Sequence, residues 1–143
     1  LSNGYFGEQL AVTGLHDAVR NQLQHLERTG LFSISFVSEI DGMQIDANKI
    51  VFLYRMVQES LNNIVKHASA NHIDVQLLYR EDRIHILIAD NGKGFDDEEG
   101  IFSRGIGLRS IRQRAEMIHA TVAVNSVVNK GTAIHLTCKP DGT

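Results

Sequence analysis

The chain has 143 residues, of which 43% are hydrophobic, and it carries a formal net charge of -3 at pH 7. This size fits one compact domain over residues 1–143, and the lack of any Lys/Arg block argues against the basic stripe of a nucleic-acid-binding protein. A single cysteine, Cys138, excludes an internal disulfide and a Cys-based zinc site, and it fits a reducing, cytoplasmic setting.

The apolar runs of the chain are short. The longest, such as residues 84–89, fall far below the roughly 20 residues of a membrane helix, so we expect no direct membrane contact from this segment. Because the sequence begins with Leu1 rather than Met, we expect it to be a piece of a longer protein, which leaves membrane anchorage of the full-length protein open.

Hydrophobic periodicity predicts a helix, a strand and a longer helix in the first half of the chain. Apolar residues recur at helical spacing over residues 15–28 and stop at Gly30, whereas residues 31–37 show the alternation and β-branched content of a strand. From Asp46, a predicted N-cap, apolar residues follow the i, i+3, i+4, i+7 spacing for about five turns, as far as Ala68.

The second half predicts two hairpins and one helix. Each hairpin consists of two alternating segments around a short turn: residues 73–79 with 84–88, and residues 122–124 with 134–138. Between them, residues 91–107 form a glycine-rich charged loop, and residues 108–118 carry a helical pattern. This order predicts an α+β fold, a two-layer α/β sandwich whose mixed, mostly antiparallel sheet carries its helices on one face.

The long helix carries polar residues that can do chemistry. At 100° per residue, Glu59, Asn63 and Lys66 fall in a narrow stripe. The opposite face is apolar and consists of Ile50, Leu53, Tyr54, Val57, Leu61, Ile64 and Val65. One face is therefore predicted to pack while the other meets a ligand, and the alternative is that the polar stripe is the solvated side of an amphipathic helix.

Two glycine-rich turns complete a predicted nucleotide site. A predicted strand runs into Asp90-Asn91-Gly92-Lys93-Gly94, where a carboxylate can accept from an amino group and glycines let the backbone approach a flat ligand. Gly105-Ile106-Gly107 precedes a helix, whose free N–H groups suit phosphate oxygens. The alternative for the first segment is an ordinary Asp-Asn-Gly turn after a strand. The alternative for the second is a flexible loop that meets a helix cap. P-loop and Rossmann motifs do not occur.

The ordered motifs resemble a known family. Gln-Glu-x-Leu-x-Asn-x-x-x-His-Ala, Asp-x-Gly-x-Gly-Phe, Gly-x-Gly-Leu and a final Gly-Thr are similar to the N, G1, G2 and G3 boxes of the catalytic, ATP-binding domain of sensor histidine kinases. That domain belongs to the GHKL ATPase superfamily shared with gyrase B, Hsp90 and MutL. The resemblance covers residues 14–138, and the first box is similar to that of the nitrate/nitrite-sensor-like subfamily. It implies the Bergerat fold, with residues 1–13 connecting from a dimerisation domain outside the chain.

The resemblance also implies the cofactors ATP and Mg²⁺ and a role for each box. Asn63 would coordinate Mg²⁺, and Glu59 would act as general base toward the attacking histidine. The adjacent Asn62 is the alternative metal ligand, and Asn63 is preferred because it lies four residues after Glu59 on the same stripe. Asp90 would accept a hydrogen bond from the adenine amino group, with Thr132 nearby through a water. The other implied ATP-binding residues are Lys66 and His67 near the phosphates, Gly92 and Gly94 around the adenine, and Arg104, Gly105, Ile106, Gly107 and Leu108 at the end of a mobile lid, about residues 96–104.

The implied activity is transfer of the ATP γ-phosphoryl group to a histidine on a separate dimerisation and phosphoacceptor domain, for relay to a response regulator, in a full-length homodimer. Leu15-His16-Asp17 superficially resembles the phosphorylated motif of the family. His16 precedes Asn63 by only 47 residues, which leave no room for a helical hairpin, so we expect the acceptor outside this chain and a surface or packing role for His16.

Two alternatives remain open. A regulatory module of the same fold, either an anti-sigma-type serine kinase or a nucleotide-sensing pseudokinase, would share the nucleotide site, although Glu59 argues against a pseudokinase. A gyrase- or Hsp90-like ATPase would need additional transducer domains. The identity of the phosphorylated residue would separate the first alternative from a histidine kinase.

Overall fold

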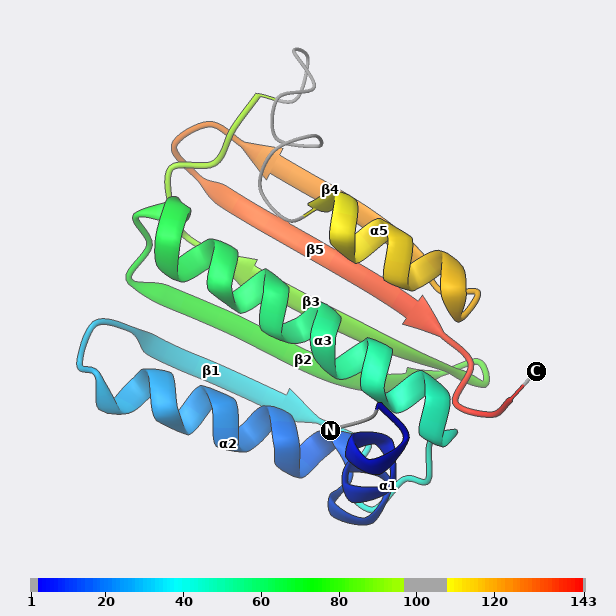
Figure 1. Cartoon of the computed structure of the whole chain (residues 1–143). Helices are drawn as coiled ribbons and strands as arrows, with labels where there is room; N and C mark the ends of the chain where they lie inside the picture. Colours follow the sequence, from blue (N-terminus) through cyan, green and yellow to red (C-terminus); the bar gives the residue numbers. More distant parts are fainter. Residues whose placement is uncertain (1–2, 97–107, 143) are drawn as a thin grey trace.

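A five-stranded mixed sheet carries its helices on one face in the computed structural model, which describes residues 3–96 and 108–142 (Figure 1). The strands are β1 (Ser33–Ser38), β2 (His72–Arg80), β3 (Arg83–Asp90), β4 (Thr121–Val127) and β5 (Gly131–Cys138), in the spatial order β1-β2-β3-β5-β4. Only the β1–β2 pair is parallel among these strands. The predicted two-layer sandwich with a mostly antiparallel sheet is confirmed.

The hairpin between β2 and β3 sets the position of Asp90. Glu81 and Asp82 both have positive φ angles, 53° and 62°, as a two-residue hairpin turn matched to the twist of the strands requires. The resulting register pairs Arg80 with Arg83 and continues to Ile73 opposite Asp90. Asp90 is therefore the last residue of a strand whose alternate side chains are buried.

Three predicted helices are confirmed: α2 (Leu15–Arg28), α3 (Ala47–Asn63) and α5 (Leu108–Met117). The side chain of Asp46 accepts hydrogen bonds from the backbone N–H groups of Asn48 and Lys49, which makes Asp46 the predicted N-cap of α3. Together these helices cover one face of the sheet, with α3 across its centre (Figure 1).

A further helix, α1 (Asn3–Thr13), lies where the sequence analysis predicted only a connecting segment. Its hydrophobic residues lack strong helical periodicity, and its contacts with α3 account for its position instead. The ring of Phe6 meets that of Tyr54 edge to face, with centroids 5.9 Å apart, and the guanidinium of Arg55 lies 4.6 Å from the Phe6 centroid. A Cβ atom on Gly7 would lie 2.9 Å from the carbonyl oxygen of Ala47, so the two helices approach closely there.

The end of the long helix differs from the prediction. One α-helix was expected as far as Ala68, but α3 gives way to a π-helical turn, η1 (Ile64–Ala68). The turn ends at Ser69, which has a left-handed φ of 54°. Val65 was predicted on the apolar face, and this was wrong because 46% of its surface is exposed. Single π turns of this kind often occur at functional sites.

The core lies between the helices and the covered face of the sheet. Leu53, Met56 and Val57 of α3 are fully buried there, as are Ile86 of β3 and Leu136 of β5. In the described part of the chain, no helix combines the length and apolar character needed to cross a membrane.

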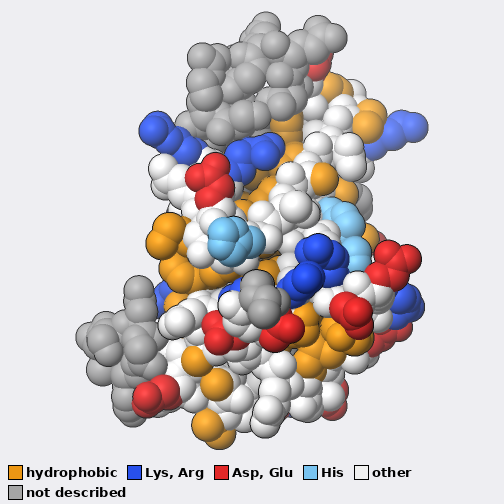
Figure 2. Space-filling model, turned by 90° about the vertical axis from the view of Figure 1, so that its right-hand side faces the viewer, with side chains coloured by type: hydrophobic (Ala, Val, Ile, Leu, Met, Phe, Trp, Pro, Cys, Tyr) orange, Lys and Arg blue, Asp and Glu red, His pale blue; other side chains and the backbone are white. Residues whose placement is uncertain are grey.

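At the end of the molecule away from the α3–η1 junction, the described residues mix positive and negative side chains. Figure 2 shows this end with Lys and Arg side chains interspersed with Asp and Glu. On this face the described residues therefore form no continuous basic stripe, in line with the net charge of -3.

Candidate functional site

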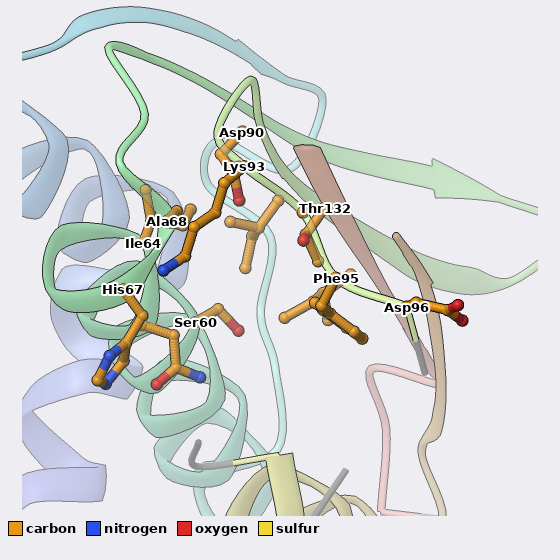
Figure 3. Close-up of a pocket in the computed structure, with 13 residues that line it drawn as sticks. Ser60, Ile64, His67, Ala68, Asp90, Lys93, Phe95, Asp96 and Thr132 are labelled. Carbon is orange, nitrogen blue, oxygen red and sulfur yellow. The ribbon is translucent and has the colours of Figure 1, made fainter. Parts of the chain in front are cut away.

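A cavity of about 310 Å³ opens between the end of the long helix and the sheet. Ile88 of β3 and Ile134 of β5 contribute its sheet side, while Ile64 of η1 contributes its helix side. The loop that follows β3 closes a third side with Phe95 (Figure 3). An apolar cavity with a few polar groups is typical of a small-molecule site.

Asp90 is the acidic group on the sheet side of the cavity. Its carboxylate accepts a hydrogen bond from the backbone N–H of Gly92 at 2.7 Å and another from the backbone N–H of Thr132. Burial raises the pKa of Asp90, and the two hydrogen bonds oppose that rise. A fixed carboxylate among apolar side chains is a specific acceptor for an amino group on a flat ligand.

Gly92 and Gly94 let the loop pass between two other backbone segments. A Cβ atom on Gly92 would overlap the carbonyl oxygen of Ala68. Gly94 has a φ of +59°, and a Cβ atom there would overlap the carbonyl oxygen of Val127. Both glycines thus shape the cavity through backbone contacts, although their proposed contact with adenine stays a prediction.

Polar side chains hold this loop in place. The Asn91 side-chain oxygen accepts from the backbone N–H groups of Asn71 and His72, both at 3.0 Å. The hydroxyl oxygen of Ser126 in β4 accepts a hydrogen bond from the backbone N–H of Phe95 at 2.9 Å. The same oxygen lies 2.8 Å from the hydroxyl oxygen of Thr132. Asn91 and Ser126 were not among the predicted site residues, because their contacts depend on strand register.

Asn63 is a polar residue on the helix side of the cavity whose side chain has a hydrogen-bond donor left unsatisfied by the described residues. Its Nδ2 atom is buried and has no hydrogen-bond partner in the described part of the chain, and its side chain lines the cavity. An unpartnered buried amide is unfavourable by about 1–3 kcal/mol, so a ligand that pairs with it would recover this loss. Because amide oxygen and nitrogen positions are interchangeable, the oxygen can equally face the cavity.

The amide of Asn63 fits a magnesium–nucleotide complex. Mg²⁺ takes few protein oxygen ligands and combines them with phosphate oxygens. A half-buried side chain at the cavity, whose buried Nδ2 atom has no partner among the described residues, meets that requirement when its amide oxygen faces the ion. Asn62 is exposed and does not line the cavity, which favours Asn63 over its neighbour as the ligand.

The predicted polar stripe of the helix faces the cavity only in part. At 100° per residue in an ideal helix, Glu59 and Lys66 fall about 40° and 60° to one side of Asn63. Ser60 and His67 fall about 60° and 40° to its other side, and this second side lines the cavity. Glu59 is half-buried and Lys66 is exposed, and neither lines the cavity. Their predicted roles stay predictions.

The other predicted residues divide into three groups. The structure brings Asn63, His67, Asp90, Gly94 and Thr132 together around one cavity, with Gly92 buried against Ala68 beside it. Leu108 begins α5, and its side chain is completely buried in the core. Arg104, Gly105, Ile106 and Gly107 lie outside the described residues.

Lining residues that the sequence analysis missed include Ser60, Lys93 and Phe95. Ser60 donates its hydroxyl hydrogen to the carbonyl oxygen of Met56 at 2.8 Å. Lys93 and Phe95 were visible inside the Asp90-to-Phe95 motif. Their contact with the cavity could not be predicted, because side-chain direction in a loop follows no periodicity.

His16 has the packing role that was expected. Its Nδ1 lies 2.7 Å from the Ser38 hydroxyl oxygen, and its ring lies against Phe36 with centroids 5.6 Å apart. Its Nε2 faces the carboxylates of Asp17 and Asp41, each at 3.9 Å. These contacts tie the start of α2 to the end of β1.

Known proteins with similar sequences show the family of this chain. Residues 48–142 match the model of the histidine kinase-, DNA gyrase B- and HSP90-like ATPases. The chain is 31% identical over 126 residues to the oxygen sensor histidine kinase NreB of Staphylococcus carnosus, covering 86% of this chain and 35% of NreB. It is 34% identical over 111 residues to the signal transduction histidine-protein kinase/phosphatase DegS of Brevibacillus brevis, covering 76% of this chain and 28% of DegS.

Solved structures show the same fold. The catalytic domain of the histidine kinase ThkA superposes with a TM-score of 0.71 at 14% identity, covering 92% of this chain and 94% of that domain. The histidine kinase domain of the blue-light activated kinase EL346 from Erythrobacter litoralis gives a TM-score of 0.70 at 14% identity, covering 98% of this chain and 62% of that chain. This chain therefore spans about a third of its curated relatives and nearly the whole of a catalytic domain.

Proposed function

Because this chain belongs to the family of histidine kinase-, DNA gyrase B- and HSP90-like ATPases, we propose that it is the Mg-ATP-binding catalytic domain of a sensor histidine kinase. One observation carries the proposal. Residues from three distant segments, represented by Asn63, Asp90 and Thr132, line a single cavity, and the buried Nδ2 atom of Asn63 has no hydrogen-bond partner among the described residues.

The sheet side of the cavity would bind the base. Asp90 would accept a hydrogen bond from the adenine amino group, and Thr132 would join through a water. The carboxylate of Asp90 is already held by two backbone N–H groups, so binding requires little further ordering. Gly92 and Gly94 would keep the loop close to the ring edge.

The helix side would bind the phosphates. Bound Mg²⁺ would neutralise phosphate charge and align the γ-phosphoryl group, which is the main requirement of phosphoryl transfer. Asn63 would contribute its amide oxygen to that ion, and His67, at the rim, would lie near the phosphates together with Lys66. The roles proposed for Arg104, Gly105, Ile106, Gly107 and Leu108 at the phosphates rest on the sequence motif.

Glu59 would act as the general base. It lies one helical turn before Asn63, outside the described cavity lining and half-buried. This position suits a group that meets a histidine arriving from another domain, because such a histidine must approach the γ-phosphate from outside the nucleotide cavity. The Glu59 carboxylate would accept the N–H proton of the acceptor imidazole while the other ring nitrogen attacks the γ-phosphorus.

The partners proposed are those of a sensor kinase. They are a dimerisation and phosphoacceptor domain in the same full-length protein, a second copy of that protein, and a response regulator that receives the phosphoryl group. Relatives named as histidine kinases support this proposal, as does their length, of which this chain spans 35% and 28%. We further propose a cytoplasmic location, where ATP is available.

A transfer assay tests the proposal. The chain is incubated with γ-labelled ATP, Mg²⁺ and a separately produced dimerisation domain from a related sensor kinase, and the labelled product is exposed to acid and to alkali. Label that is lost in acid and kept in alkali identifies phosphohistidine and supports the proposal. Acid-stable phosphoserine on an added protein would favour the anti-sigma-type kinase, and nucleotide binding without transfer would favour a pseudokinase.

A further inference from the structure

Lys93 is a charged side chain at the cavity that the proposed function leaves without a role. It lines the cavity, and its ammonium group makes no ion pair or hydrogen bond with the residues that the structure describes. Among those residues it is also the only Lys or Arg in the lining. Lys66, the lysine that the sequence motif predicted near the phosphates, does not line the cavity.

The backbone of Lys93 is fixed from both sides. Its N–H donates to the carbonyl oxygen of Ala68 at 2.7 Å, and its carbonyl oxygen accepts from the N–H of Asn129 at 2.6 Å. Gly92 and Gly94 on either side have no room for a Cβ atom. Lys93 is therefore the residue of this Gly-Lys-Gly turn that can place a side chain at the cavity.

The side chain crosses the base side of the cavity. In Figure 3, Lys93 leaves the loop that carries Asp90 and extends toward the helix end at Ile64 and Ala68. Ile88 and Ile134 line the cavity from the sheet. A flat ring whose edge is held by Asp90 would then lie between the sheet residues and the Lys93 side chain.

We propose that Lys93 covers the base of the bound nucleotide, with its methylene stem against one ring face and its ammonium in a cation–π contact with that ring. The inference rests on the proposed function, because it takes an aromatic base held by Asp90 as the ligand. A cation over an aromatic face at a partly exposed site corresponds to an affinity gain of about three- to tenfold. Lys93 is thus an affinity-determining residue and takes no part in the chemistry.

The experiment compares two ligands that differ only in their phosphates. Isothermal titration measures the affinity for adenosine and for Mg-ATP in the parent chain, Lys93→Met, Lys93→Ala and Lys130→Met. Lys130 is an exposed lysine of the neighbouring β4–β5 turn that does not line the cavity, so it is the matched control. Thermal unfolding of each variant confirms that it is folded.

The inference predicts the same loss for both ligands. Lys93→Met should lower the affinities for adenosine and for Mg-ATP by a common factor of about three to ten. Lys93→Ala should lower both affinities at least as much. Lys130→Met should bind both ligands as tightly as the parent. The common factor should persist at higher salt, because a short contact with an uncharged ring is weakly screened.

Three results would overturn it. A loss confined to Mg-ATP that shrinks with salt would place the ammonium at the phosphates. Unchanged affinity for both ligands in Lys93→Met and Lys93→Ala would remove Lys93 from the site while leaving the proposed function intact. Failure of the parent chain to bind either ligand would overturn the proposed function, and the Lys93 contact with it.

Discussion

The two sides of the cavity differ in how complete they are without a ligand. On the sheet side, the Asp90 carboxylate is held by the N–H groups of Gly92 and Thr132, and the adjoining backbone contacts leave no space for larger residues. On the helix side, the Nδ2 atom of Asn63 is buried and has no hydrogen-bond partner among the described residues, at the junction with a π-helical turn. This difference supports our proposal of a preformed base site beside a phosphate site that a magnesium–nucleotide complex would complete.

The largest effect is expected from the incomplete side. Asn63→Ala should reduce Mg-dependent phosphoryl transfer to background, because the proposed magnesium ligand is removed. The unliganded variant should be at least as stable as the parent, since the substitution removes an unsatisfied buried amide worth about 1–3 kcal/mol. Transfer of label from ATP and the free energy of unfolding in urea measure the two effects.

Asn62→Ala is the matched control for this prediction, because it removes the adjacent, exposed amide. It should transfer at the parent rate. Loss of transfer in Asn62→Ala with full activity in Asn63→Ala would reverse the assignment of the metal ligand.

A somewhat smaller effect is expected at Glu59, which is proposed to act on the acceptor and not on the nucleotide. Glu59→Gln should slow transfer by about 10²-fold or more, in the range that general-base catalysis contributes, while the affinity for Mg-ATP stays within about twofold of the parent. Single-turnover transfer and nucleotide titration separate the two quantities. Transfer at the parent rate would show that Glu59 is not the base.

On the sheet side, the close backbone approach at Gly92 can be tested by substitution. Gly92→Ala should lower the free energy of unfolding by more than about 2 kcal/mol, because the new Cβ atom would overlap the Ala68 carbonyl oxygen and force the two segments apart. Gly142→Ala is the control, since its nearest neighbour would lie 3.5 Å from the Cβ atom. Denaturant unfolding measures both, and equal stability of the two variants would contradict the close approach.

The smallest effect is a pH dependence that distinguishes folding from binding. The pKa of Asp90 is raised by burial, so the folded chain takes up this proton at a higher pH than the unfolded chain, whose aspartate pKa is about 3.9. The stability contributed by this group is complete below the unfolded-state pKa and is lost as the pH rises through the folded-state pKa. ATP affinity should move oppositely and weaken as the pH falls through the folded-state pKa, because the charged carboxylate would be a stronger acceptor for the adenine amino group than the neutral acid.

Asp90→Asn tests the pH prediction. It should weaken ATP binding by about tenfold or more at neutral pH, and its remaining affinity should lack the acid-side change that Asp90 causes. Titrations from pH 7 down toward pH 4 measure both. An unchanged pH profile in Asp90→Asn would show that another group is responsible.

Much of the fold could be predicted because local chemistry and tertiary structure agree. The Glu81-Asp82 turn, the N-cap at Asp46 and the alternation of β3 each indicate the element that the structure contains. Helix α1 could not be predicted, because its position depends on contacts of Phe6 with Tyr54 and Arg55 rather than on its own periodicity.

The sequence motifs predicted which segments form the site, but they predicted less well which side chains face the cavity. Asn63, Asp90 and Thr132 meet at one cavity, as the order of the motifs indicated. Which side of Asn63 faces that cavity depends on how α3 is rotated over the sheet. Ser60 therefore lines the cavity where Glu59 had been expected to face the ligand.

Unfolding of the parent chain at increasing ATP, with and without Mg²⁺, tests the central claim most directly. If the chain is a Mg-ATP-binding domain, ATP at 100 times its dissociation constant should raise the free energy of unfolding by about 2.7 kcal/mol in the presence of Mg²⁺. The gain should be smaller when Mg²⁺ is chelated, because the phosphates then lack their bridge to Asn63. Unfolding free energies that do not respond to millimolar ATP in either condition would contradict the account.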